Sequence, residues 1–425
     1  PVHDLTTNPL EKVRVGVIGT GGRGRSLIRD LSGIDFVEIA ALCDIHQDRV
    51  DRATEIIRRK RPDAAPRAFS GANSAWEKLA AMDALDVLYI ATPWEWHAPM
   101  ATRALALGKH AFVEVSAAVT VDECWELVDA SERAQRHCVI LENCCYNQSE
   151  LLVLNLVREG VFGELKHAEC AYIHDLRDVL FQLNSEGDWR RDYHRKLDGN
   201  LYPTHGLGPV ARYLGINRGD QFKTIVSVSS GEHNLTQHLR ETRPNNGRHA
   251  AETYRCGDMN TSLIKTALGR TIMVQHDVVS PRPYSRINAL SGTAATFFGY
   301  PDRLALDKPA ALNLGLAAKN AHKWLDDADL AKIREHYAHP LVRALWQKAK
   351  GAGHGGMDYV MNHRLLDCVR RGATPDLTVY DAAAWSAILE LSARSVAQNG
   401  MPVPVPDFTR GAWQTLKPAA DRMSA

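Results

Sequence analysis

A glycine-rich segment near the N-terminus has the residue types and spacing that suit a phosphate-bearing ligand. Gly19, Gly21 and Gly24 fall in the order G-x-G-x-x-G, between a β-branched run at 13–18 and a helical pattern at 26–31. In that context the first glycine permits a tight turn, the second lets the backbone approach a pyrophosphate, and the third lets the helix pack closely on the strand. The N-terminus of the helix then offers free N–H groups to the phosphates.

A carboxylate further along the chain indicates which dinucleotide this motif would hold. Asp44 directly follows the second predicted strand, 37–43. Its distance from the glycines, about 20 residues, is the one at which a carboxylate accepts the ribose hydroxyls and repels a 2′-phosphate. The next residue is Ile45 and not an arginine. The sequence therefore predicts NAD, and not NADP, as the cofactor.

Three more segments follow predicted strands of the same region. In open α/β sheets ligands bind beyond the carboxyl ends of the strands, so we expect these segments to face the cofactor. Two tryptophans in one such loop could equally form a hydrophobic plug, but the position of the loop favours cofactor contact. The residues are Trp94, Glu95, Trp96 and His97 after the strand at 87–91, Glu114 after the strand at 111–113, and Asn143 after the strand at 139–141.

A tyrosine and a histidine in the middle of the chain form a second candidate group. Tyr202 and His205 stand three residues apart at a predicted helix start, which would place them on one face. Histidine transfers protons near neutral pH with little tuning, whereas tyrosine needs neighbours that make it more acidic. Taken alone, the pattern favours a buried tyrosine and a structural histidine. Beside an NAD site, the catalytic interpretation gains weight.

Positioning these residues requires a frame that brings strand ends together. In the first third of the chain, short apolar runs alternate with helical patterns. This alternation predicts right-handed βαβ crossovers and a Rossmann-type, doubly wound parallel sheet over residues 1–145. Strand patterns separated by turn residues then dominate, and they predict an α+β domain over 146–425 with an open, mainly antiparallel sheet.

Composition and charge exclude several classes of protein. The 51 Lys and Arg against 50 Asp and Glu leave a net charge of +1, which gives no electrostatic footprint for nucleic acid or an anionic membrane. No apolar run reaches the roughly 18 residues that span a bilayer. The cysteines and histidines lack metal-binding spacing, so we expect reduced thiols and no metal. Because the chain starts at Pro1, a cytoplasmic location and export after folding to a bacterial periplasm both stay open.

Longer segments of the chain resemble one enzyme family. From Val13 to Trp413 the sequence resembles the Gfo/Idh/MocA family of NAD(P)-dependent sugar oxidoreductases. Within that family it is most similar to glycosyl hydrolase family 109, the NAD-dependent α-N-acetylgalactosaminidases. The segments that carry the narrower resemblance are 92–97 (TPWEWH), 114–115 (EV), 142–143 (EN), 187–191 (GDWRR), 200–209 (NLYPTHGLGP), 380–386 (YDAAAWS) and 403–408 (VPVPDF).

Two positions separate the chain from the dehydrogenases of the wider family. Those enzymes usually carry Glu-Lys-Pro after the fifth strand, and the lysine assists proton transfer, whereas this chain has Glu114-Val115-Ser116. They also usually carry an aspartate shortly before the catalytic histidine, where this chain has Tyr202 before His205. Both differences fit the glycosidase branch. That branch usually reads Glu-Val-Pro, so Ser116 departs from it as well.

The resemblance implies hydrolysis by a route distinct from the paired-carboxylate mechanism. Tightly bound NAD would take a hydride from C3 of the sugar, and the resulting ketone would make the C2 proton acidic. A base would remove that proton, the group at C1 would leave by elimination, water would add, and the hydride would return to C3. NAD would thus be regenerated in each turnover. The implied substrate is a glycan or glycoside with a terminal α-linked N-acetylgalactosamine.

The resemblance also implies roles for individual residues. His205 and Tyr202 are the leading proton-transfer candidates, with Tyr172 or Glu114 assisting. For Tyr284 a core-capping role is equally open. The implied NAD contacts are Gly19, Gly21, Arg23, Gly24, Asp44, Trp94, Glu95, Trp96, His97, Glu114, Val115 and Asn143, and the implied sugar contacts are Tyr172, Arg191, Tyr202, Pro203, Thr204, His205 and Tyr284.

Three interpretations from different classes stay open at this point. The first is the glycosidase, and the second is an NAD-dependent sugar dehydrogenase with net oxidation. The third is a non-catalytic NAD-binding sensor, because fold does not fix function. The missing lysine after Glu114 argues against the second interpretation, and the presence of Tyr202 and His205 argues against the third. A homo-oligomer stays open under each of them.

Overall fold

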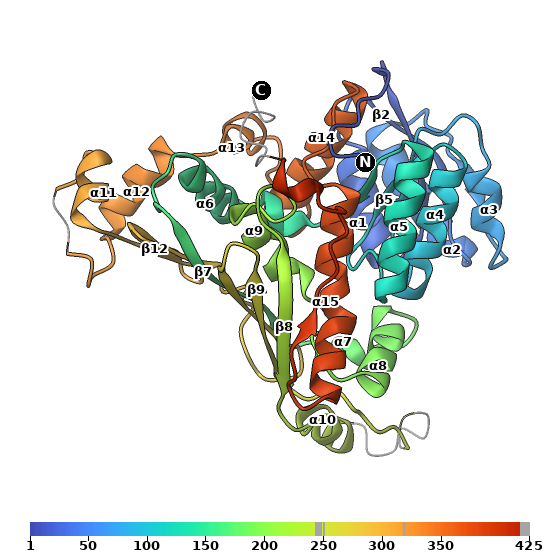
Figure 1. The fold of residues 1–425 in the computed structure, drawn as a ribbon. Coiled ribbons are helices and arrows are strands. Elements are labelled where there is room, and N and C mark those ends of the chain that lie inside the picture. The colour runs from blue at the N-terminus through green and yellow to red at the C-terminus, as the bar shows by residue number, and fades with distance from the viewer. Residues whose placement is uncertain (243–248, 250, 318–319, 417–425) are drawn as a thin grey trace. The chain divides into compact units, whose positions relative to one another are not determined.

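The computed structural model describes residues 1–242, 249, 251–317 and 320–416 (Figure 1). The chain forms two compact units. Among the described residues, the first unit contains Pro1–Asn147 and Leu341–Ser386, and the second contains residues 148–340 and 387–416. The sequence predicts a single boundary after residue 145, and the structure differs by returning residues 341–386 to the first unit. Local sequence pattern cannot show this return, because it depends on packing between segments more than 200 residues apart, such as α14 on α1.

The first unit contains a six-stranded, entirely parallel sheet in the order β3-β2-β1-β4-β5-β6, and this arrangement confirms the predicted Rossmann-type fold. Strands β4 and β5 are buried along their whole length, as expected when helices cover both faces of a parallel sheet. The strands are β1 Val13–Ile18, β2 Val37–Cys43, β3 Arg67–Phe69, β4 Val87–Ile90, β5 His110–Val113 and β6 Cys138–Ile140.

In the sequence, the helices of the first unit lie between these strands and within residues 341–386, which belong to the same unit. Helix α5 begins with a capping box formed by Thr120 and Glu123, which satisfies N–H groups of its first turn. The elements are α1 Gly22–Leu31, α2 Gln47–Lys60, α3 Ala75–Ala80, η1 Trp94–Trp96, α4 His97–Ala106, α5 Val121–Ala134, η2 Asn143–Tyr146, η3 Gly353–Gly356 and α14 Met357–Arg370.

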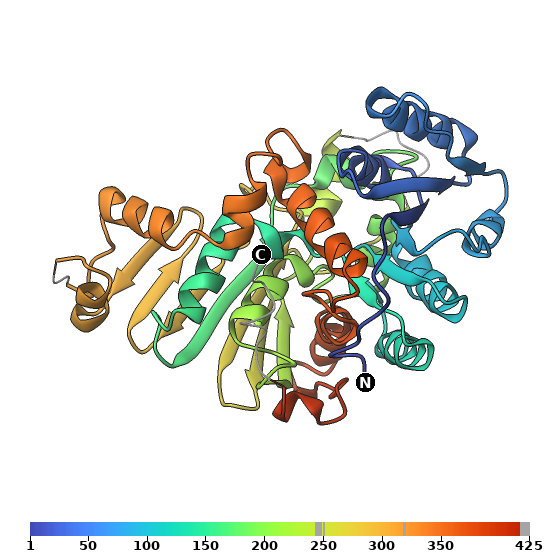
Figure 2. The ribbon, with the colours of Figure 1, turned by 90° about the horizontal axis from the view of Figure 1, so that it is seen from above.

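The second unit contains an eight-stranded sheet in the order β13-β12-β11-β7-β10-β9-β8-β14, whose strands lie side by side in Figure 2. Only the β7–β10 pair is parallel among the described pairings, which confirms the predicted mainly antiparallel sheet. The strands are β7 Leu165–Ile173, β8 Phe222–Ser229, β9 Asn260–Thr266, β10 Thr271–Asp277, β11 Ala289–Gly292, β12 Ala295–Phe298, β13 Arg303–Leu306 and β14 Val403–Pro404.

One face of this sheet is covered by helices. Helix α9 packs on β7, and α6 packs on α9. Along β9 the side chains alternate between buried and exposed, so the other face is open to solvent there. The remaining elements of the second unit are α6 Gln148–Arg158, α7 Arg177–Leu180, α8 Glu186–Lys196, α9 Thr204–Tyr213, α10 Asn234–Thr242, α11 Lys308–Asn313, α12 Asp327–His336 and η4 Ala412–Gln414. Helix α13 Pro340–Leu345 belongs almost entirely to the first unit, and α15 Val379–Ala397 begins in the first unit and ends in the second.

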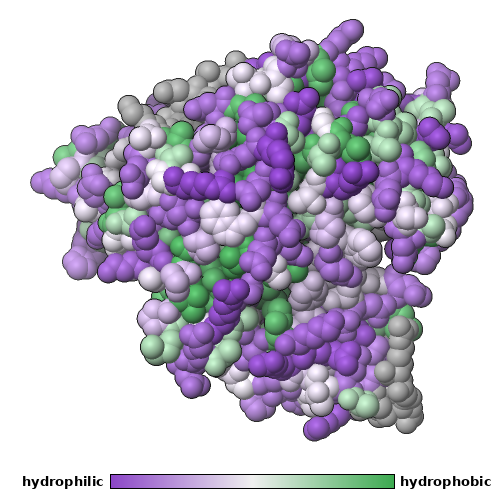
Figure 3. Space-filling model, turned by 45° about the vertical axis from the view of Figure 1, so that its right-hand side comes forward, coloured by the Kyte–Doolittle hydropathy of each residue, from purple (hydrophilic) through white to green (hydrophobic). Residues whose placement is uncertain are grey.

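Several general expectations can be compared with the described residues. All eight cysteines are buried, and none of them forms a disulfide. Within the described part of the chain, no helix is long and apolar enough to cross a membrane. The molecular face drawn in Figure 3 is mostly hydrophilic, with apolar side chains in small areas. These features agree with the composition of a protein whose apolar residues mainly fill cores.

Candidate active site

The glycine-rich turn of the first unit has the shape that its motif requires. Gly19 has a φ of +87°, and a Cβ atom there would collide with the Ala91 carbonyl oxygen. A Cβ atom on Gly24 would collide with the Gly19 carbonyl oxygen. Only glycine fits at these two positions, because the turn is closed by close backbone approaches.

The N-terminus of α1 fits the phosphates of a dinucleotide. The nearest atom that a Cβ on Gly21 would meet is Nη1 of Arg49 at 3.9 Å, so packing within the protein does not explain this glycine. The first turn of α1 has no side-chain cap and no acidic residue. Its N–H groups and the positive end of the helix dipole therefore favour an anion, and the bare backbone at Gly21 allows close approach.

Asp44 lies at the carboxyl end of β2, beside the glycine turn. Its carboxylate accepts hydrogen bonds from the backbone N–H groups of Thr20 at 2.8 Å and His46 at 3.0 Å. A carboxylate has about four acceptor positions, so it retains capacity for ribose hydroxyls. Arg49 from α2 lies 3.9 Å from the same carboxylate. The prediction of NAD and not NADP rests on Asp44 and Ile45, and the structure adds Arg49 as a nearby cation that the sequence did not reveal.

The buried carboxylate of Asp358 contacts two of the predicted cofactor residues, and one of these, Arg23, contacts a third. Arg23 donates from Nε to Glu114 at 2.7 Å and from Nη1 to Asp358 at 2.5 Å. Asn143 donates from Nδ2 to the other oxygen of Asp358 at 2.6 Å, and His354 lies 2.8 Å from Asp358. Burial would raise the pKa of Asp358, but Arg23 and His354 hold it well below its usual range. Sequence reasoning missed Asp358, because it lies 335 residues beyond Arg23 and 215 residues beyond Asn143.

Two residues of the predicted cofactor loop have structural contacts. Trp94 is buried and donates from its indole N–H to the Val115 carbonyl at 3.0 Å. The ring nitrogens of His97 lie 2.7 Å from the Ser116 carbonyl oxygen and 2.8 Å from that of Thr92. Burial lowers the pKa of His97. Trp94 and His97 thus tie the loop after β4 to the turn after β5.

The side chains of that loop that remain accessible are Glu95 and Trp96. Both are exposed, and Trp96 retains 37% of its surface. Glu95, Trp96 and the backbone can therefore provide the predicted cofactor contacts of this loop. His97 uses both ring nitrogens within the protein.

The second unit brings four predicted sugar-site residues together. The ring centres of Tyr172 and Tyr202 are 4.5 Å apart, and that of His205 lies 5.2 Å from Tyr172 and 4.8 Å from Tyr202. Tyr284 is 6.2 Å from Tyr172. Tyr172 comes from β7 and His205 from α9. A Cβ atom on Gly206 would lie 2.5 Å from the Ala171 backbone nitrogen, so this glycine permits the close approach of α9 to β7.

Pro203 and Thr204 form the start of α9, between the tyrosine and the histidine. Pro203 occupies the N-cap position, and Thr204 is the first helical residue. Thr204 is fully buried, and its hydroxyl has no hydrogen-bond partner among the described residues. Pro203 and Thr204 thus set the direction of the backbone between Tyr202 and His205.

Arg191 is a correction to the predicted sugar contacts. Its guanidinium is buried and donates to Glu252 at 2.9 Å and to the Leu180 carbonyl at 2.5 Å. The preceding residue, Arg190, lies with its guanidinium carbon 5.0 Å from the ring centre of Tyr202. Consecutive residues of α8 point about 100° apart, so only one can face the cluster. The structure places Arg190 there, and Arg191 stabilises the loop around Glu252.

Three histidines that adjoin the cluster were missed by sequence reasoning; His194 and His276 are buried, and His174 is half-buried. The ring centres of His174 and His276 lie 4.8 and 6.4 Å from Tyr172, and His194 is 6.2 Å from His276. Burial, together with Arg190, lowers the pKa of both His174 and His194 to about 4. Burial also lowers the pKa of His276. These imidazoles are therefore neutral at pH 7.

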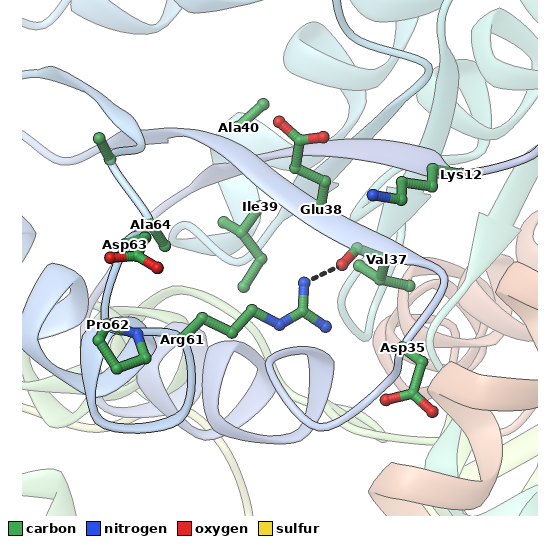
Figure 4. A pocket seen from close by; sticks show the side chains of 11 residues that line it. Lys12, Asp35, Val37, Glu38, Ile39, Ala40, Arg61, Pro62, Asp63 and Ala64 are labelled. Carbon is green, nitrogen blue, oxygen red and sulfur yellow. Dashed lines mark hydrogen bonds between the residues drawn. The ribbon is translucent and has the colours of Figure 1, made fainter.

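A pocket of 380 Å³ in the first unit is lined by none of the predicted site residues (Figure 4). It is lined at the start of β2 by residues such as Val37 and Glu38, at the strand end opposite to Asp44. Arg61 projects over it but donates to the carbonyl oxygens of Val37 and Ile34. Because its cation already has backbone partners, we assign no ligand to this pocket.

Comparison with known proteins identifies the family. Residues 146–415 match the model of the glycosyl hydrolase 109 C-terminal domain, and residues 13–141 match that of the oxidoreductase family with an NAD-binding Rossmann fold. The chain belongs to glycosyl hydrolase family 109. This confirms the resemblance found in the sequence and makes the protein a glycosidase with an NAD-binding domain.

Similar proteins cover almost the whole chain. A family 109 protein from Solibacter usitatus is 48% identical over 416 residues, which cover 97% of this chain and 92% of that protein. An α-N-acetylgalactosaminidase from Shewanella oneidensis is 47% identical over 420 residues, which cover 98% and 89%. The crystal structure of an NAD binding oxidoreductase from Klebsiella pneumoniae matches with a TM-score of 0.70 at 17% identity, over 93% and 99% of the two chains, and shows the fold alone.

The departure of this family 109 chain at Ser116 is accommodated locally. Ser116 is fully buried, and its carbonyl oxygen faces His97. The neighbouring Val115 carbonyl accepts from Trp94. The turn after Glu114 is thus held by two side chains of the preceding loop, and the position of Glu114 against Arg23 is retained.

Proposed function

We propose that this family 109 glycosidase removes terminal α-linked N-acetylgalactosamine from a glycan or glycoside. The observation that carries the proposal is the convergence of Tyr172, Tyr202 and His205 within ring-centre distances of 4.5 to 5.2 Å. The choice of substrate is supported by the α-N-acetylgalactosaminidase that is 47% identical to this chain. The aromatic rings suit the apolar face of a sugar, and the polar groups beside them suit its hydroxyls.

We further propose that NAD is tightly bound by the first unit. Gly19, Gly21 and Gly24 would hold the pyrophosphate at the start of α1, and Asp44 would hold the ribose. Arg23, Glu95, Trp96, Glu114, Val115 and Asn143 are the further proposed contacts. When bound, NAD would supply a reversible hydride acceptor for C3 of the sugar, so that the net reaction is hydrolysis.

The protein's own residues would then carry out the proton transfers. The C3 hydroxyl loses a proton when that carbon is oxidised, and C2 next to the ketone loses a proton as the C1 group leaves. We assign these transfers to His205 and Tyr202, with Tyr172 or Glu114 assisting. Arg190 beside Tyr202 favours the ionised phenol, because a nearby cation stabilises a negative charge.

The direct test uses p-nitrophenyl N-acetyl-α-galactosaminide and purified protein without added cofactor. We expect nitrophenol to accumulate with no net formation of NADH. Formation of NADH in proportion to product, dependent on added NAD, would instead support a sugar dehydrogenase. No turnover despite bound NAD would support the sensor. Acid release of the bound nucleotide identifies it, and finding none or finding NADP would contradict the cofactor proposal.

Turnover in deuterium oxide tests the elimination step. If the C2 proton leaves during turnover, it can exchange with solvent, and deuterium should appear at C2 of the released sugar. A dehydrogenase or a two-carboxylate hydrolase would place none there. Cleavage that persists in correctly folded protein without NAD would exclude the elimination mechanism for this chain.

A further inference from the structure

A buried ion pair lies behind Tyr284 in the second unit. Glu150 on α6 and Arg286 retain only 1% and 3% of their surface. Arg286 donates from Nε at 2.9 Å and from Nη2 at 2.5 Å to one oxygen of Glu150. Removing two charges from water costs several kcal/mol per ion, and apolar replacements of such pairs are often no less stable. The stability of the unit alone therefore gives little reason for this pair.

The third nitrogen of Arg286 connects the pair to Tyr284. Arg286 donates from Nη1 to the Tyr284 hydroxyl oxygen at 2.9 Å. Its guanidinium carbon also lies 5.5 Å from the ring centre of Tyr284 and 5.4 Å from that of Tyr300. A guanidinium can only donate, so the tyrosine oxygen accepts and the phenol keeps its own proton for another partner. The adjacent cation also polarises this O–H group.

The backbone places this arrangement beside the proposed sugar site. Ser285 pairs with Ile173, and the Arg286 carbonyl accepts from the Ala171 N–H group at 2.8 Å, so the segment runs along the end of β7. Tyr284 lies 6.2 Å from Tyr172 and 5.1 Å from His174, between ring centres. It retains 39% of its surface, in contrast to the two charged residues behind it.

We propose that Arg286, held by Glu150, is a positioning residue that orients Tyr284 and strengthens its hydroxyl as a hydrogen-bond donor to an oxygen of the sugar. This inference rests on the proposed function for the identity of the ligand. It gives Tyr284 a specific task, in place of the core-capping role that the sequence left open. It also explains why a costly buried ion pair stands directly behind an accessible tyrosine.

A double-mutant cycle tests whether Arg286 acts through the tyrosine. We expect Tyr284→Phe and Arg286→Met each to lower kcat/KM for the p-nitrophenyl substrate about tenfold, the range for one hydrogen bond in a site. Because both changes remove the same interaction, the double variant should be no more than about threefold worse than the poorer single variant. Losses that multiply to about a hundredfold would overturn the proposal.

Matched variants separate positioning from stability. Arg286→Lys keeps the cation and should recover part of the loss. Arg364→Met breaks a comparable buried pair, with Asp376, in the first unit, and its effect should simply multiply with that of Tyr284→Phe. If Arg286→Met does not fold, as judged by its melting temperature, Glu150→Gln replaces it in the cycle. If the effects of both Arg286→Met and Glu150→Gln simply multiply with that of Tyr284→Phe, the proposal is overturned.

A chemical readout keeps this test independent of the proposed function. Tetranitromethane nitrates the phenolate form of accessible tyrosines, and a neighbouring cation favours that form. Nitration of Tyr284, measured by peptide mass spectrometry against Tyr337 as the internal reference, should be about tenfold slower in Arg286→Met. Slower nitration in a protein without glycosidase activity would reject the function and retain the Arg286–Tyr284 coupling. Unchanged nitration would reject the coupling itself.

Discussion

The polar clusters of the two units are built on opposite electrostatic principles. In the first unit Arg23 is fixed between Glu114 and Asp358, so the charges are paired and held in one geometry. In the second unit the rings of Tyr172, Tyr202 and His205 adjoin histidines that stay neutral, such as His174. Paired charges resist any change of protonation, whereas a phenol such as Tyr202 beside the cation of Arg190 can give up a proton. The first arrangement suits holding a ligand, and the second suits chemistry.

The largest effect should come from the proton-transfer residue of the second unit. His205→Ala should lower kcat about 10²- to 10⁴-fold, the range for loss of a general acid or base. Because we assign His205 to the sugar and not to the cofactor, bound NAD released by acid should be unchanged. If His205→Ala lost bound NAD together with activity, this result would contradict the assignment of His205 to the sugar.

The next effect concerns the paired charges of the first unit. Asp358→Asn leaves Arg23 with a single carboxylate partner and should cost about 3 to 5 kcal/mol of unfolding free energy, NAD affinity or both. Urea unfolding and nucleotide content measure the two contributions. Asp86→Asn, which breaks the more exposed pair with Arg14, is the matched control and should cost at most about 1 kcal/mol. Equal costs for both variants would refute the special role of Asp358.

A smaller effect is expected at the ribose position. Asp44→Ala should weaken NAD binding by about 1.5 to 3 kcal/mol, the contribution of hydrogen bonds to a charged group. It should also shift the preference toward NADP, because Arg49 then loses its nearby carboxylate. Binding titrations with both nucleotides measure this. Asp48→Ala, at a surface pair with Arg52, provides the control, and unchanged NAD affinity in Asp44→Ala would show that Asp44 does not contact the cofactor.

The features that sequence reasoning found are the local ones. The turn from Gly19 to Gly24 and the carboxylate of Asp44 belong to one βαβ unit, so strand and helix periodicity sufficed to bring them together. The resemblance to a family added Tyr172, Tyr202 and His205, whose meeting depends on the crossing of α9 and β7.

The features that it missed depend on distance or on helix rotation. Asp358 is separated from Arg23 by 335 residues, and no local pattern joins them. Arg190 and Arg191 are adjacent and chemically identical, so only the rotation of α8 distinguishes the residue that faces Tyr202. His174 is recognisable only by its neighbours, because a lone histidine carries no spacing signal.

The smallest effect tests whether the first unit also contains neutral, buried imidazoles. His110 and His137 of the first unit stack with ring centres 5.0 Å apart, and the His137 backbone N–H donates to Nδ1 of His110 at 3.0 Å. Burial and Arg136 lower the pKa of His137 to about 4, and the pKa of His110 is lowered as well. Both histidines are far from the strand ends that carry Asp44 and Glu114, at the start of β5 and β6.

The sign of the resulting pH dependence follows from proton uptake. Between pH 6.5 and about 4 the unfolded chain binds a proton at residue 137 that the folded protein does not, so acid lowers the free energy of unfolding by about 1.4 kcal/mol per pH unit. His137→Gln removes this titration while keeping a polar side chain. Its disadvantage relative to the wild-type protein in urea unfolding should therefore shrink as the pH falls from 6.5 to 4.5. A constant difference would mean that His137 is protonated in the folded protein, and that the first unit tolerates a buried imidazolium without a carboxylate partner.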